Sequence, residues 1–545
     1  MLMMRNPFQL EGLSPGDVPP LQAVVVGSGI GGAAAALLLA DAGIPTMLVE
    51  KNRRIGGSCS GYEKQGFQID IGTHMFCRGP KGPLGDVLRR VGEEGAIDFR
   101  RTRDIAELRF PARGPGARRG DVVQIPVPAE IRRMPRFAWE LGRALDLSPR
   151  DAARAARMFA HILTMSDADA LAWNDRTVED FILPFTDHPA TIGVFSFLLG
   201  LYFILPYWEV SAGEALWSFR QMMRDNWLSY PKGGSIAIPG AYCRLAEARG
   251  ACVRTGVGVE RIVVTEGCVR GVELADGTFL PARIVISTSS VRTTVTRLVG
   301  EAHFPADYVA RARAIKGSYI AVQAKIGLRK KLVSAGALVG GVGEKIDLLS
   351  LTPPDLKKMF ASVAEGKVPP IIPFYCPVPT NFDPDLAPPG HQLLTVCALA
   401  PTSDVTLVDP GSVWEEAMLH TLRRVVPGLD EHTLFVDRFS VDFIERWIGK
   451  EFGPAVSTGQ TPDQVGKRRP PVFTPVRGLY LAGCGAGARG VGTELAAASA
   501  MECVDRILVD LGLGLGAPAL NLPLAGAVDL LARATMAPIA WATRF

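Results

Sequence analysis

The stretch Ala23-Val-Val-Val-Gly27-Ser-Gly29-Ile-Gly-Gly32 decides the fold, because an apolar, β-branched run meets a cluster of glycines and continues into an alanine- and leucine-rich helix. Gly27, Gly29 and Gly32 have G-x-G-x-x-G spacing. The first glycine permits a tight turn, the second lets the backbone approach a pyrophosphate, and the third lets helix pack on strand. The N-terminus of the helix offers free N–H groups to the phosphates. An adenine dinucleotide site is therefore predicted at Gly27, Ser28, Gly29, Ile30, Gly31 and Gly32.

An acidic residue ends the next apolar run. Residues 46–49 predict a second strand, and Glu50 follows it, 23 positions after Gly27. A carboxylate in this place accepts a hydrogen bond from a ribose 2′-OH and disfavours a 2′-phosphate. This order of elements (strand, glycine turn, helix, strand, acid) is that of a Rossmann-like α/β domain with a parallel sheet.

The residues after Glu50 indicate which dinucleotide is bound. Lys-Asn-Arg-Arg-Ile-Gly-Gly-Ser occupies 51–58, and Gly-Phe-Gln-Ile-Asp-Ile-Gly-Thr-His occupies 66–74. This pattern resembles the flavoprotein superfamily of amine oxidases, phytoene desaturases and Rab GDP-dissociation inhibitors. The resemblance implies a GR2-type domain with FAD bound along it; a plain NAD site would not need the second glycine pair. It adds these cofactor-binding residues: Lys51, Gly56, Gly57, Ser58, Gly72 and Thr73.

Two later blocks extend the resemblance towards the phytoene desaturase, carotenoid isomerase and retinol saturase branch. Residues 230–288 contain Y-P-x-G-G, a V-x-x-I strand, a hairpin turning at Asp276-Gly277, and a strand ending in I-S-T. By the resemblance, Val259 offers its backbone to the adenine. Residues 478–494 form a second strand–glycine–helix unit that the resemblance places beside the ribityl chain and flavin ring. Its expected cofactor residues are Gly483, Gly492 and Thr493.

The second block departs from the family pattern at one position. Many relatives have an acidic residue after the strand glycine, where this chain has Cys484. Glu494 is the nearest acid in the sequence. The departure concerns the binding of the ribityl chain or pyrophosphate and leaves the flavin prediction itself unchanged.

Composition excludes several classes of protein. The chain has 545 residues, a formal net charge of +4, 48% hydrophobic and 21% charged residues, so nothing points to nucleic acid. Its nine cysteines are scattered and lack C-x-x-C, which argues for reduced thiols in a cytoplasmic setting. The seven histidines lie far apart, and we expect no metal site. Residues 1–20 lack an apolar run, so no signal peptide is expected.

Three segments suggest contact with an apolar molecule or with a membrane surface. Residues 189–208 are twenty residues without a charge, long enough to span a bilayer. A single span would separate the two halves of the cofactor domain, so we interpret the segment as the wall of a cavity for a long hydrocarbon. The arginine-rich stretch 78–143 is either a surface for anionic lipid headgroups or a solvated basic face. Residues 511–545 form either an interfacial segment or a surface that packs on the core or on a second copy.

These observations predict a discontinuous organisation. The expected fold class is α/β, with a Rossmann-like FAD-binding domain, a discontinuous α+β substrate domain and a helical, membrane-proximal insert. The expected parts are FAD-binding residues 1–77, 230–300 and 441–510, a helical or substrate insert at 78–229, a substrate-binding part at 301–440, and an apolar tail at 511–545.

The expected function follows from the flavin, because no catalytic serine or metal constellation is visible and the cofactor carries the difficult chemistry. We expect an FAD-dependent oxidoreductase that desaturates, saturates or isomerises a long isoprenoid or polyene, in the cytoplasm and peripherally attached to a membrane. Flavin amine oxidation and a non-catalytic prenyl-lipid escort of the GDP-dissociation inhibitor type are the alternatives. The oligomeric state stays open. Candidate catalytic residues are His74, Glu494 and Arg489.

Overall fold

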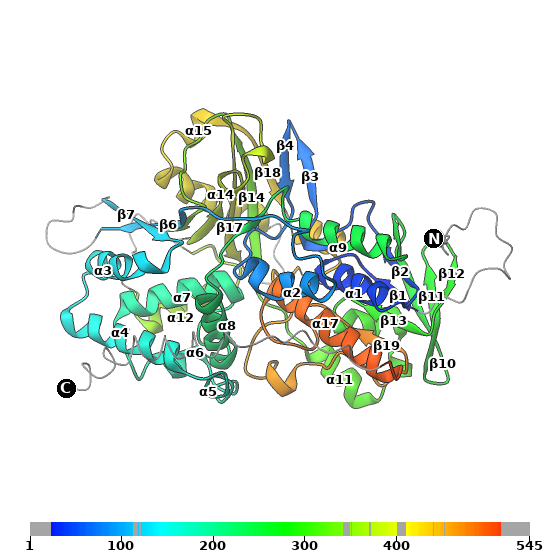
Figure 1. The fold of residues 1–545 in the computed structure, drawn as a ribbon. Helices are drawn as coiled ribbons and strands as arrows, with labels where there is room; N and C mark the ends of the chain where they lie inside the picture. Colours follow the sequence, from blue (N-terminus) through cyan, green and yellow to red (C-terminus); the bar gives the residue numbers. More distant parts are fainter. Residues whose placement is uncertain are drawn as a thin grey trace.

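The computed structural model of the chain describes residues 23–112, 118, 121–341, 349, 351–369, 372–400, 410–439, 441–451 and 453–513 (Figure 1). Of the expected apolar tail at 511–545, all but the first three residues lie outside this set. The described residues form a parallel sheet with its covering layers, a larger mixed sheet, and a group of helices beside that second sheet.

The first sheet has five strands, and every pair in it is parallel. Four of the five are buried along their whole length, as expected for strands covered on both sides, whereas the edge strand at Cys252–Thr255 is partly exposed. In spatial order they are β19 (Leu479–Leu481), β13 (Ile284–Ser287), β1 (Ala23–Val26), β2 (Thr46–Glu50) and β9 (Cys252–Thr255). Strands that lie more than 450 positions apart in the sequence therefore build one sheet.

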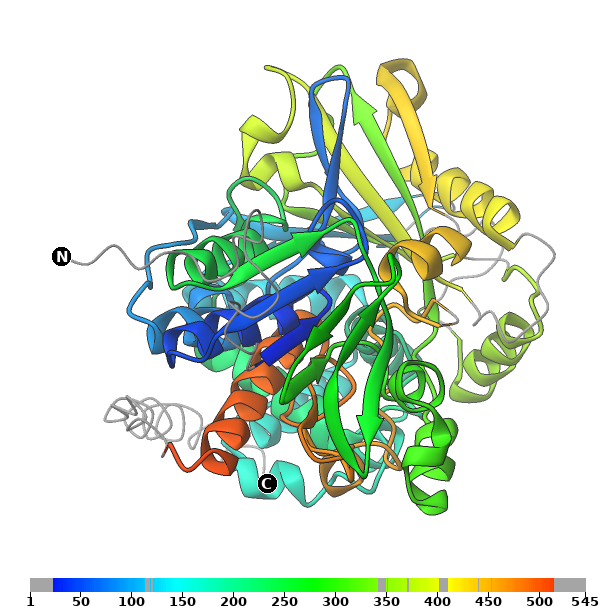
Figure 2. The same ribbon diagram turned by 90° about the vertical axis from the view of Figure 1, so that its right-hand side faces the viewer.

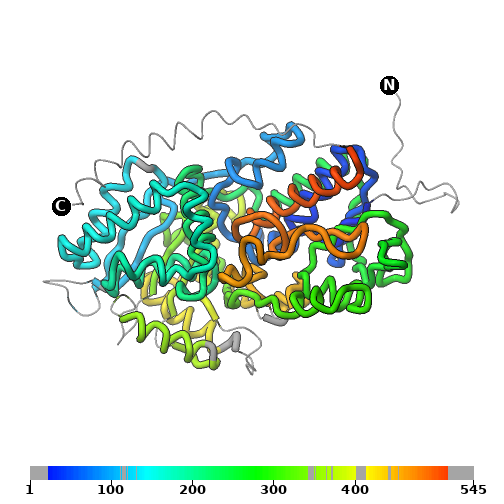
Figure 3. The backbone as a smooth tube through the Cα atoms, turned by 90° about the horizontal axis from the view of Figure 1, so that it is seen from below, coloured from blue at the N-terminus to red at the C-terminus, as the bar shows by residue number. Residues whose placement is uncertain are grey.

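Helices cover one face of this sheet. The small side chains of Ala33–Ala36 are fully buried and let α1 pack closely against α9 and α17. Figure 3 shows α17, in red, beside the blue α1, so helices near the two ends of the described chain lie side by side. The helices of this layer are α1 (Ile30–Asp41), α2 (Pro83–Arg90), α9 (Ala237–Ala248) and α17 (Gly492–Asp510).

A three-stranded antiparallel meander covers the other face (Figure 2). Val24 and Val26 point to this side, whereas Ala23 and Val25 point to the helices, as the alternation of a strand requires. The predicted Asp276-Gly277 turn joins the second and third strands of the meander. Its strands are β10 (Val259–Thr265), β11 (Cys268–Leu274) and β12 (Phe279–Pro281).

The second sheet has seven strands and is antiparallel except between β15 and β6. On one face it packs against α14 (Pro410–Val425), whose Trp414 is buried. In spatial order its strands are β18 (Thr433–Phe439), β14 (Ile320–Leu328), β17 (Gln392–Ala400), β16 (Phe374–Pro377), β15 (Ala337–Gly340), β6 (Asp104–Pro111) and β7 (Val122–Pro128). Thus the region 78–229, expected to be a helical or substrate insert, contributes two strands to the sheet as well as helices.

A group of helices packs beside this sheet. Ser166 and Thr177 form capping boxes with the residues three positions later, which fixes where two of the short helices begin. The helices of the group are α3 (Met134–Ala144), α4 (Pro149–Thr164), α5 (Asp167–Leu171), α6 (Val178–Ile182), α7 (Pro189–Phe203), α8 (Ala212–Asp225) and α12 (Pro353–Ala364).

The uncharged segment 189–208 forms α7 and the turn after it. Its 15-residue helix packs against α8 on one side and places Phe197 and Leu201 against the second sheet on the other. Within the described ranges, no helix has both the length and the apolar character needed to cross a membrane. The interpretation of 189–208 as a wall inside the protein therefore fits the fold.

Further strands and α-helices complete the described part of the chain. They are β3 (Gly61–Lys64), β4 (Phe67–Asp70), β5 (Phe99–Arg100), β8 (Tyr230–Pro231), α10 (Val291–Thr293), α11 (Ala306–Ala314), α13 (Pro379–Phe382), α14 (Pro410–Val425), α15 (Leu429–His432) and α16 (Val441–Ile448).

Candidate functional site

A cavity of about 700 Å³ opens at the carboxyl ends of β1, β2, β13 and β19. Ligands of parallel α/β sheets bind at this edge, because the loops that follow the strands converge there. Fifteen of the seventeen cofactor residues expected from the sequence line it. They are Gly27, Ser28, Gly29, Ile30, Gly31, Glu50, Lys51, Gly56, Gly57, Ser58, Thr73, Val259, Gly483, Gly492 and Thr493.

The first glycine turn has the geometry that its three glycines require. Gly27 has φ +93°, which favours glycine, and a Cβ on Gly32 would lie 1.9 Å from the carbonyl oxygen of Gly27. A Cβ on Gly29, in contrast, would meet no protein atom within 4 Å. Gly29 is also the N-cap of α1 and has no side chain to cap it. The turn therefore leaves space and N–H groups for a pyrophosphate.

Two other expected glycines shape the cavity by packing. A Cβ on Gly57 would lie 3.3 Å from Cα of Gly29, so the second glycine pair lies directly beside the first turn. Gly72 does not line the cavity, and its N–H donates to the carbonyl of Ser58 at 3.1 Å. Gly72 thus supports the 56–58 loop from behind, as Gly32 supports the first turn.

Glu50 is a buried, fixed carboxylate at one end of the cavity. Its Oε2 accepts hydrogen bonds from the N–H (2.9 Å) and the hydroxyl (2.7 Å) of Ser28, and its Oε1 accepts from the N–H of Asn52 (2.9 Å). These three donors hold the carboxylate in one orientation. It can then accept from a ribose hydroxyl without reorganising, in the place where the sequence predicts that contact.

One side of the cavity comes from residues that the sequence motifs did not indicate. Trp447, at the end of α16, lines the cavity, and its buried Nε1 has no hydrogen-bond partner in the described part of the chain. The side chains of Lys51 and Asn52 donate to the carbonyls of Arg446 and Trp447 and so attach this segment to the glycine motif. The segment is placed by contacts between residues 395 positions apart, which no local pattern reveals.

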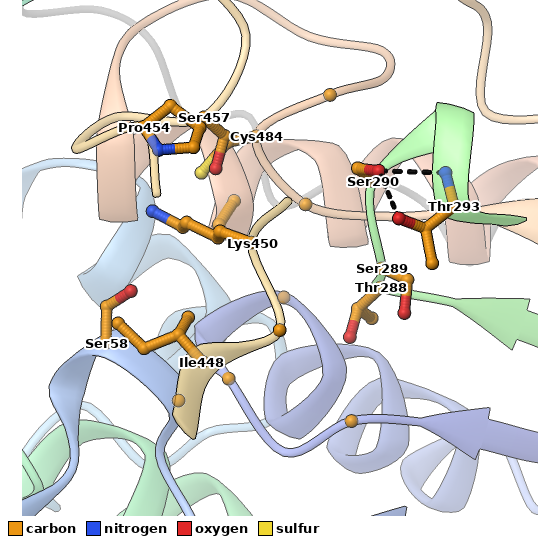
Figure 4. Close-up of a pocket in the computed structure, with 18 of the residues that line it drawn as sticks. Ser58, Thr288, Ser289, Ser290, Thr293, Ile448, Lys450, Pro454, Ser457 and Cys484 are labelled. Atoms are coloured by element: carbon orange, nitrogen blue, oxygen red, sulfur yellow. Dashed lines mark hydrogen bonds between the residues drawn. The ribbon is translucent and has the colours of Figure 1, made fainter. Parts of the chain in front are cut away.

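Cys484, at the position where the resemblance led us to expect an acid, lies in the cavity wall. Its thiol donates to the carbonyl of Gly492 at 3.0 Å, and burial raises its pKa, so it presents a neutral group. Lys450 and Ser457 lie beside it on one side of the cavity, while Thr288 to Thr293 lie on the other (Figure 4). A lysine and a serine hydroxyl therefore lie beside the position that lacks the acid.

Glu494 does not replace that acid. It does not line the cavity, and its Oε1 accepts from the N–H of Arg78 at 3.0 Å. Burial raises the pKa of Glu494 to about 7, against the opposing effect of the Arg78 cation.

Arg489 also lies outside the cavity lining. Its guanidinium donates to Glu214 (3.1 Å) and Asn174 (3.0 Å) and lies 5.2 Å from the ring of Trp217. These contacts attach the 485–492 loop to α8. For both Glu494 and Arg489, a catalytic role stays a prediction.

His74 follows Thr73, which lines the cavity, and belongs to a buried polar group on the second sheet. Its Nε2 lies 3.2 Å from Oε1 of Gln323, which also accepts from Nζ of Lys325 at 2.9 Å. Burial, then the Lys325 cation, holds the pKa of His74 well below its ordinary value, so the ring is neutral. Desolvation lowers the pKa of the fully buried Lys325 to about 7.

A second, smaller cavity of about 90 Å³ lies between α7, α12 and the second sheet. Its walls include Gly200, Leu201, Met359, Phe360, Tyr375 and Leu399, and none of the described residues that line it is charged. Consecutive residues at the end of α7 line the two cavities, Ile204 the small one and Leu205 the large one. Ile204 has φ +52°, an uncommon conformation for a β-branched residue.

In the described ranges, no group of three or more His, Cys, Asp or Glu side chains could hold a metal ion.

Comparisons with known proteins agree with a flavin site. Residues 30–508 match the model of the family described as flavin containing amine oxidoreductase. The chain is 26% identical over 410 residues to the zeta-carotene-forming phytoene desaturase of Myxococcus xanthus, covering 69% of this chain and 72% of that protein. It is 43% identical to the all-trans-retinol 13,14-reductase of Danio rerio, but over only 74 residues, which is 13% of this chain and 12% of the reductase.

Solved structures share the fold. An oxidoreductase from Methanosarcina mazei superposes with a TM-score of 0.67 at 21% identity, covering 89% of this chain and 99% of that one. Putrescine oxidase bound to putrescine gives a TM-score of 0.60 at 16% identity, over 91% and 99% of the two chains. A Rab GDP-dissociation inhibitor from Plasmodium falciparum gives 0.53 at 12% identity, over 89% and 98%. At these identities the likeness concerns the fold.

Proposed function

The chain belongs to the flavin-containing amine oxidoreductase family, its cofactor is FAD, and from this premise we propose that it acts on carbon–carbon bonds of a long apolar isoprenoid or polyene. The single observation that carries the proposal is the uncharged cavity beside the cofactor cavity. Ile204 lines the uncharged cavity, and the next residue, Leu205, lines the cofactor cavity. A cavity with this lining is suited to an apolar part of such a molecule, because none of the described residues that line it is charged.

The residues of the large cavity fit FAD. Glu50 would hold the ribose of the adenosine, the open space at Gly29 would admit the pyrophosphate, and Trp447 offers an unused N–H donor. When bound, FAD supplies the transfer of a hydride to or from a carbon atom. The protein's own contribution is to fix the cofactor and to hold the substrate in a dry cavity next to it.

The relatives favour this class of substrate over amines. The names of the phytoene desaturase and of the retinol 13,14-reductase indicate a polyene and a retinoid respectively. The identity to the desaturase is low and the match to the reductase is short. We therefore base the proposed substrate class of this chain on the apolar cavity. Desaturation, saturation and isomerisation all use the same two cavities.

An apolar substrate also has to reach the protein, and we propose that it does so at an anionic membrane surface. On α3, Trp139 is 61% exposed and Arg143 lies 4.8 Å from its ring. Arg132 and Arg136 are also exposed. An exposed Trp among arginines is suited to the headgroup region of a lipid surface. Co-sedimentation with phosphatidylserine vesicles, lost in Trp139→Ser, tests this; binding unaffected by the substitution would contradict it.

The experiment for the main proposal uses the holoenzyme and one substitution. Gly200 lies in α7, lines the apolar cavity, and has no protein atom within 4 Å of its would-be Cβ. The Cβ of Gly200→Phe therefore has open space, and its ring should take up room in the cavity. We expect the flavin spectrum of the variant to be unchanged, with bands at about 370 and 450 nm. A C20 polyene should change the spectrum of the wild type but not that of Gly200→Phe. Gly200→Ala, which adds one methyl group, is the matched control.

Three outcomes would overturn the proposal. A purified protein that takes up no FAD would favour a prenyl-lipid escort. Flavin reduction by amines but not by polyenes would favour amine oxidation. An unchanged polyene response in Gly200→Phe would show that the apolar cavity is not the substrate site.

A further inference from the structure

The floor of the apolar cavity continues into a polar patch. In the register of β14 with β17, Ala321, Gln323 and Lys325 lie opposite Leu399, Cys397 and Thr395 respectively. Residues directly opposite in an antiparallel pair project to the same face, and alternate residues of one strand share it. Ala321, Leu399 and Cys397 line the cavity, so the side chains of Gln323, Lys325 and Thr395 extend the same face.

This patch contains polar atoms without partners. Nδ1 of His74, Oγ1 of Thr395 and Oη of Tyr375 are buried and make no hydrogen bond within the described structure. Thr395 is fully buried and pairs with Lys325, while Tyr375 pairs with Cys397 and itself lines the apolar cavity. Native proteins rarely leave buried polar atoms unpaired without a bound molecule to satisfy them.

The hydrogen bonds assign a role to each group. Oε1 of Gln323 accepts from Nζ of Lys325, and Nε2 of the neutral His74 ring, 3.2 Å away, donates to the same oxygen. The His74 tautomer follows from this network, and it leaves Nδ1 as an acceptor. Lys325 has further N–H groups to donate. The nearest carboxylate, Asp70, is already engaged by Tyr230 and Ser235.

We propose that the substrate is an isoprenoid or polyene carrying a hydroxyl group, and that His74, Lys325 and Thr395 bind this hydroxyl. This inference rests on the proposed function and narrows it. A hydroxyl both donates and accepts, so it can give its proton to Nδ1 of His74 and accept from Lys325 and Thr395. A hydrocarbon would leave Nδ1 of His74 and the hydroxyl of Thr395 unpaired, and a carboxylate has no proton for Nδ1.

The position of the patch adds a geometric consequence. Thr73, next to His74, lines the cofactor cavity, and Cys397, opposite Gln323, lines the apolar cavity, so the hydroxyl would be bound between the two cavities. The hydroxyl-bearing end of the molecule therefore lies towards the cofactor, and the apolar remainder extends along α7.

The test compares ligands of equal length on the FAD-loaded enzyme. Three ligands are titrated while the flavin absorbance is recorded. They are the alcohol geranylgeraniol, the corresponding hydrocarbon without the hydroxyl, and geranylgeranic acid. We expect the alcohol to bind at least about tenfold more tightly than the hydrocarbon, because the hydrocarbon leaves buried polar groups unpaired. The acid should bind more weakly than the alcohol.

Substitutions connect this preference to the patch. Thr395→Val keeps the shape of the side chain and removes the hydroxyl, and Lys325→Met removes the donor. Each should reduce the preference for the alcohol while leaving the affinity for the hydrocarbon within about twofold of the wild type. Thr421→Val, an equally buried change on α14 across the second sheet, is the control and should keep the preference. If Lys325→Met fails to bind FAD, Thr395→Val still decides.

Each contrary result has a separate meaning. Equal binding of alcohol and hydrocarbon, or a preference that survives in Thr395→Val and Lys325→Met, overturns the hydroxyl site and indicates that only water satisfies these groups. Tighter binding of the acid overturns the assignment to a hydroxyl. If none of the three ligands changes the flavin spectrum, the proposed isoprenoid function itself fails.

Discussion

Gly32 and Gly27 are in contact across the first glycine turn, since a Cβ on Gly32 would lie 1.9 Å from the carbonyl oxygen of Gly27. Gly29, in the same turn, faces open space instead. The three glycines of one motif therefore serve different purposes. Two of them allow the chain to fold, and one keeps space for the cofactor.

This difference predicts opposite results for two similar substitutions. Gly32→Ala should destabilise the protein by about 3 kcal/mol or more, because the methyl group collides with backbone. Gly29→Ala should leave the thermal stability of the FAD-free protein unchanged and raise the Kd for FAD at least roughly tenfold, because its methyl group occupies the pyrophosphate position. Thermal unfolding and FAD titration measure both. Equal stability of the two FAD-free variants would contradict the assignment.

The fixed carboxylate of Glu50 gives a second prediction. Glu50→Gln should raise the Kd for FAD roughly 10- to 100-fold, since the amide replaces a charged acceptor for the ribose and turns an N–H towards the donors of Ser28. Glu63→Gln, an exposed change on β3, is the matched control and should bind FAD normally. Wild-type affinity in Glu50→Gln would exclude the ribose contact.

Lys325 predicts a pH dependence of stability. Its pKa is about 7 in the folded protein and near its ordinary value of 10.5 in the unfolded chain, so between these values the unfolded state binds more protons. The free energy of unfolding contributed by this residue therefore rises with pH from about 7 upwards. Lys325→Met removes this contribution. Relative to the wild type, it should be more stable at pH 7 than at pH 9, as measured by urea unfolding, whereas exposed Lys330→Met should show no such difference.

Glu494 predicts the opposite slope at lower pH. Burial raises its pKa from 4.5 to about 7, so the folded state binds more protons between these values, and stability falls as the pH rises through this range. Glu494→Gln, which resembles the protonated acid, should be more stable relative to the wild type at pH 8 than at pH 5. Urea unfolding at the two pH values measures the difference. Exposed Glu365→Gln should show none, and an equal effect of Glu494→Gln at both pH values would contradict the raised pKa.

The sequence predicted those features that depend on local patterns. The glycine turns, Glu50 and the Asp276-Gly277 hairpin all require particular residues at fixed spacing, so a single chain reveals them. The apolar run at 189–208 likewise indicated a cavity wall from its composition and its place in the chain.

Features that depend on distant contacts could not be predicted. Trp447 reaches the cavity because Lys51 and Asn52 hold its segment from 395 positions away. Arg489, a candidate for catalysis because of its glycine-rich surroundings, is paired with Glu214 on a helix that the motif does not mention. The strands β6 and β7 join the second sheet through a parallel contact with β15, which alternation of side chains alone does not specify.

The central strand β1 has its neighbours in residues 46–50 and 284–287, and the sheet is completed only by residues 479–481. During synthesis, the first glycine turn leaves the ribosome long before the elements that enclose it. A nascent chain therefore exposes apolar strands for most of its translation, and the flavin can be enclosed only when almost the whole polypeptide has been made. We therefore expect the growing chain to need protection from aggregation, and holoenzyme formation to come late in biogenesis.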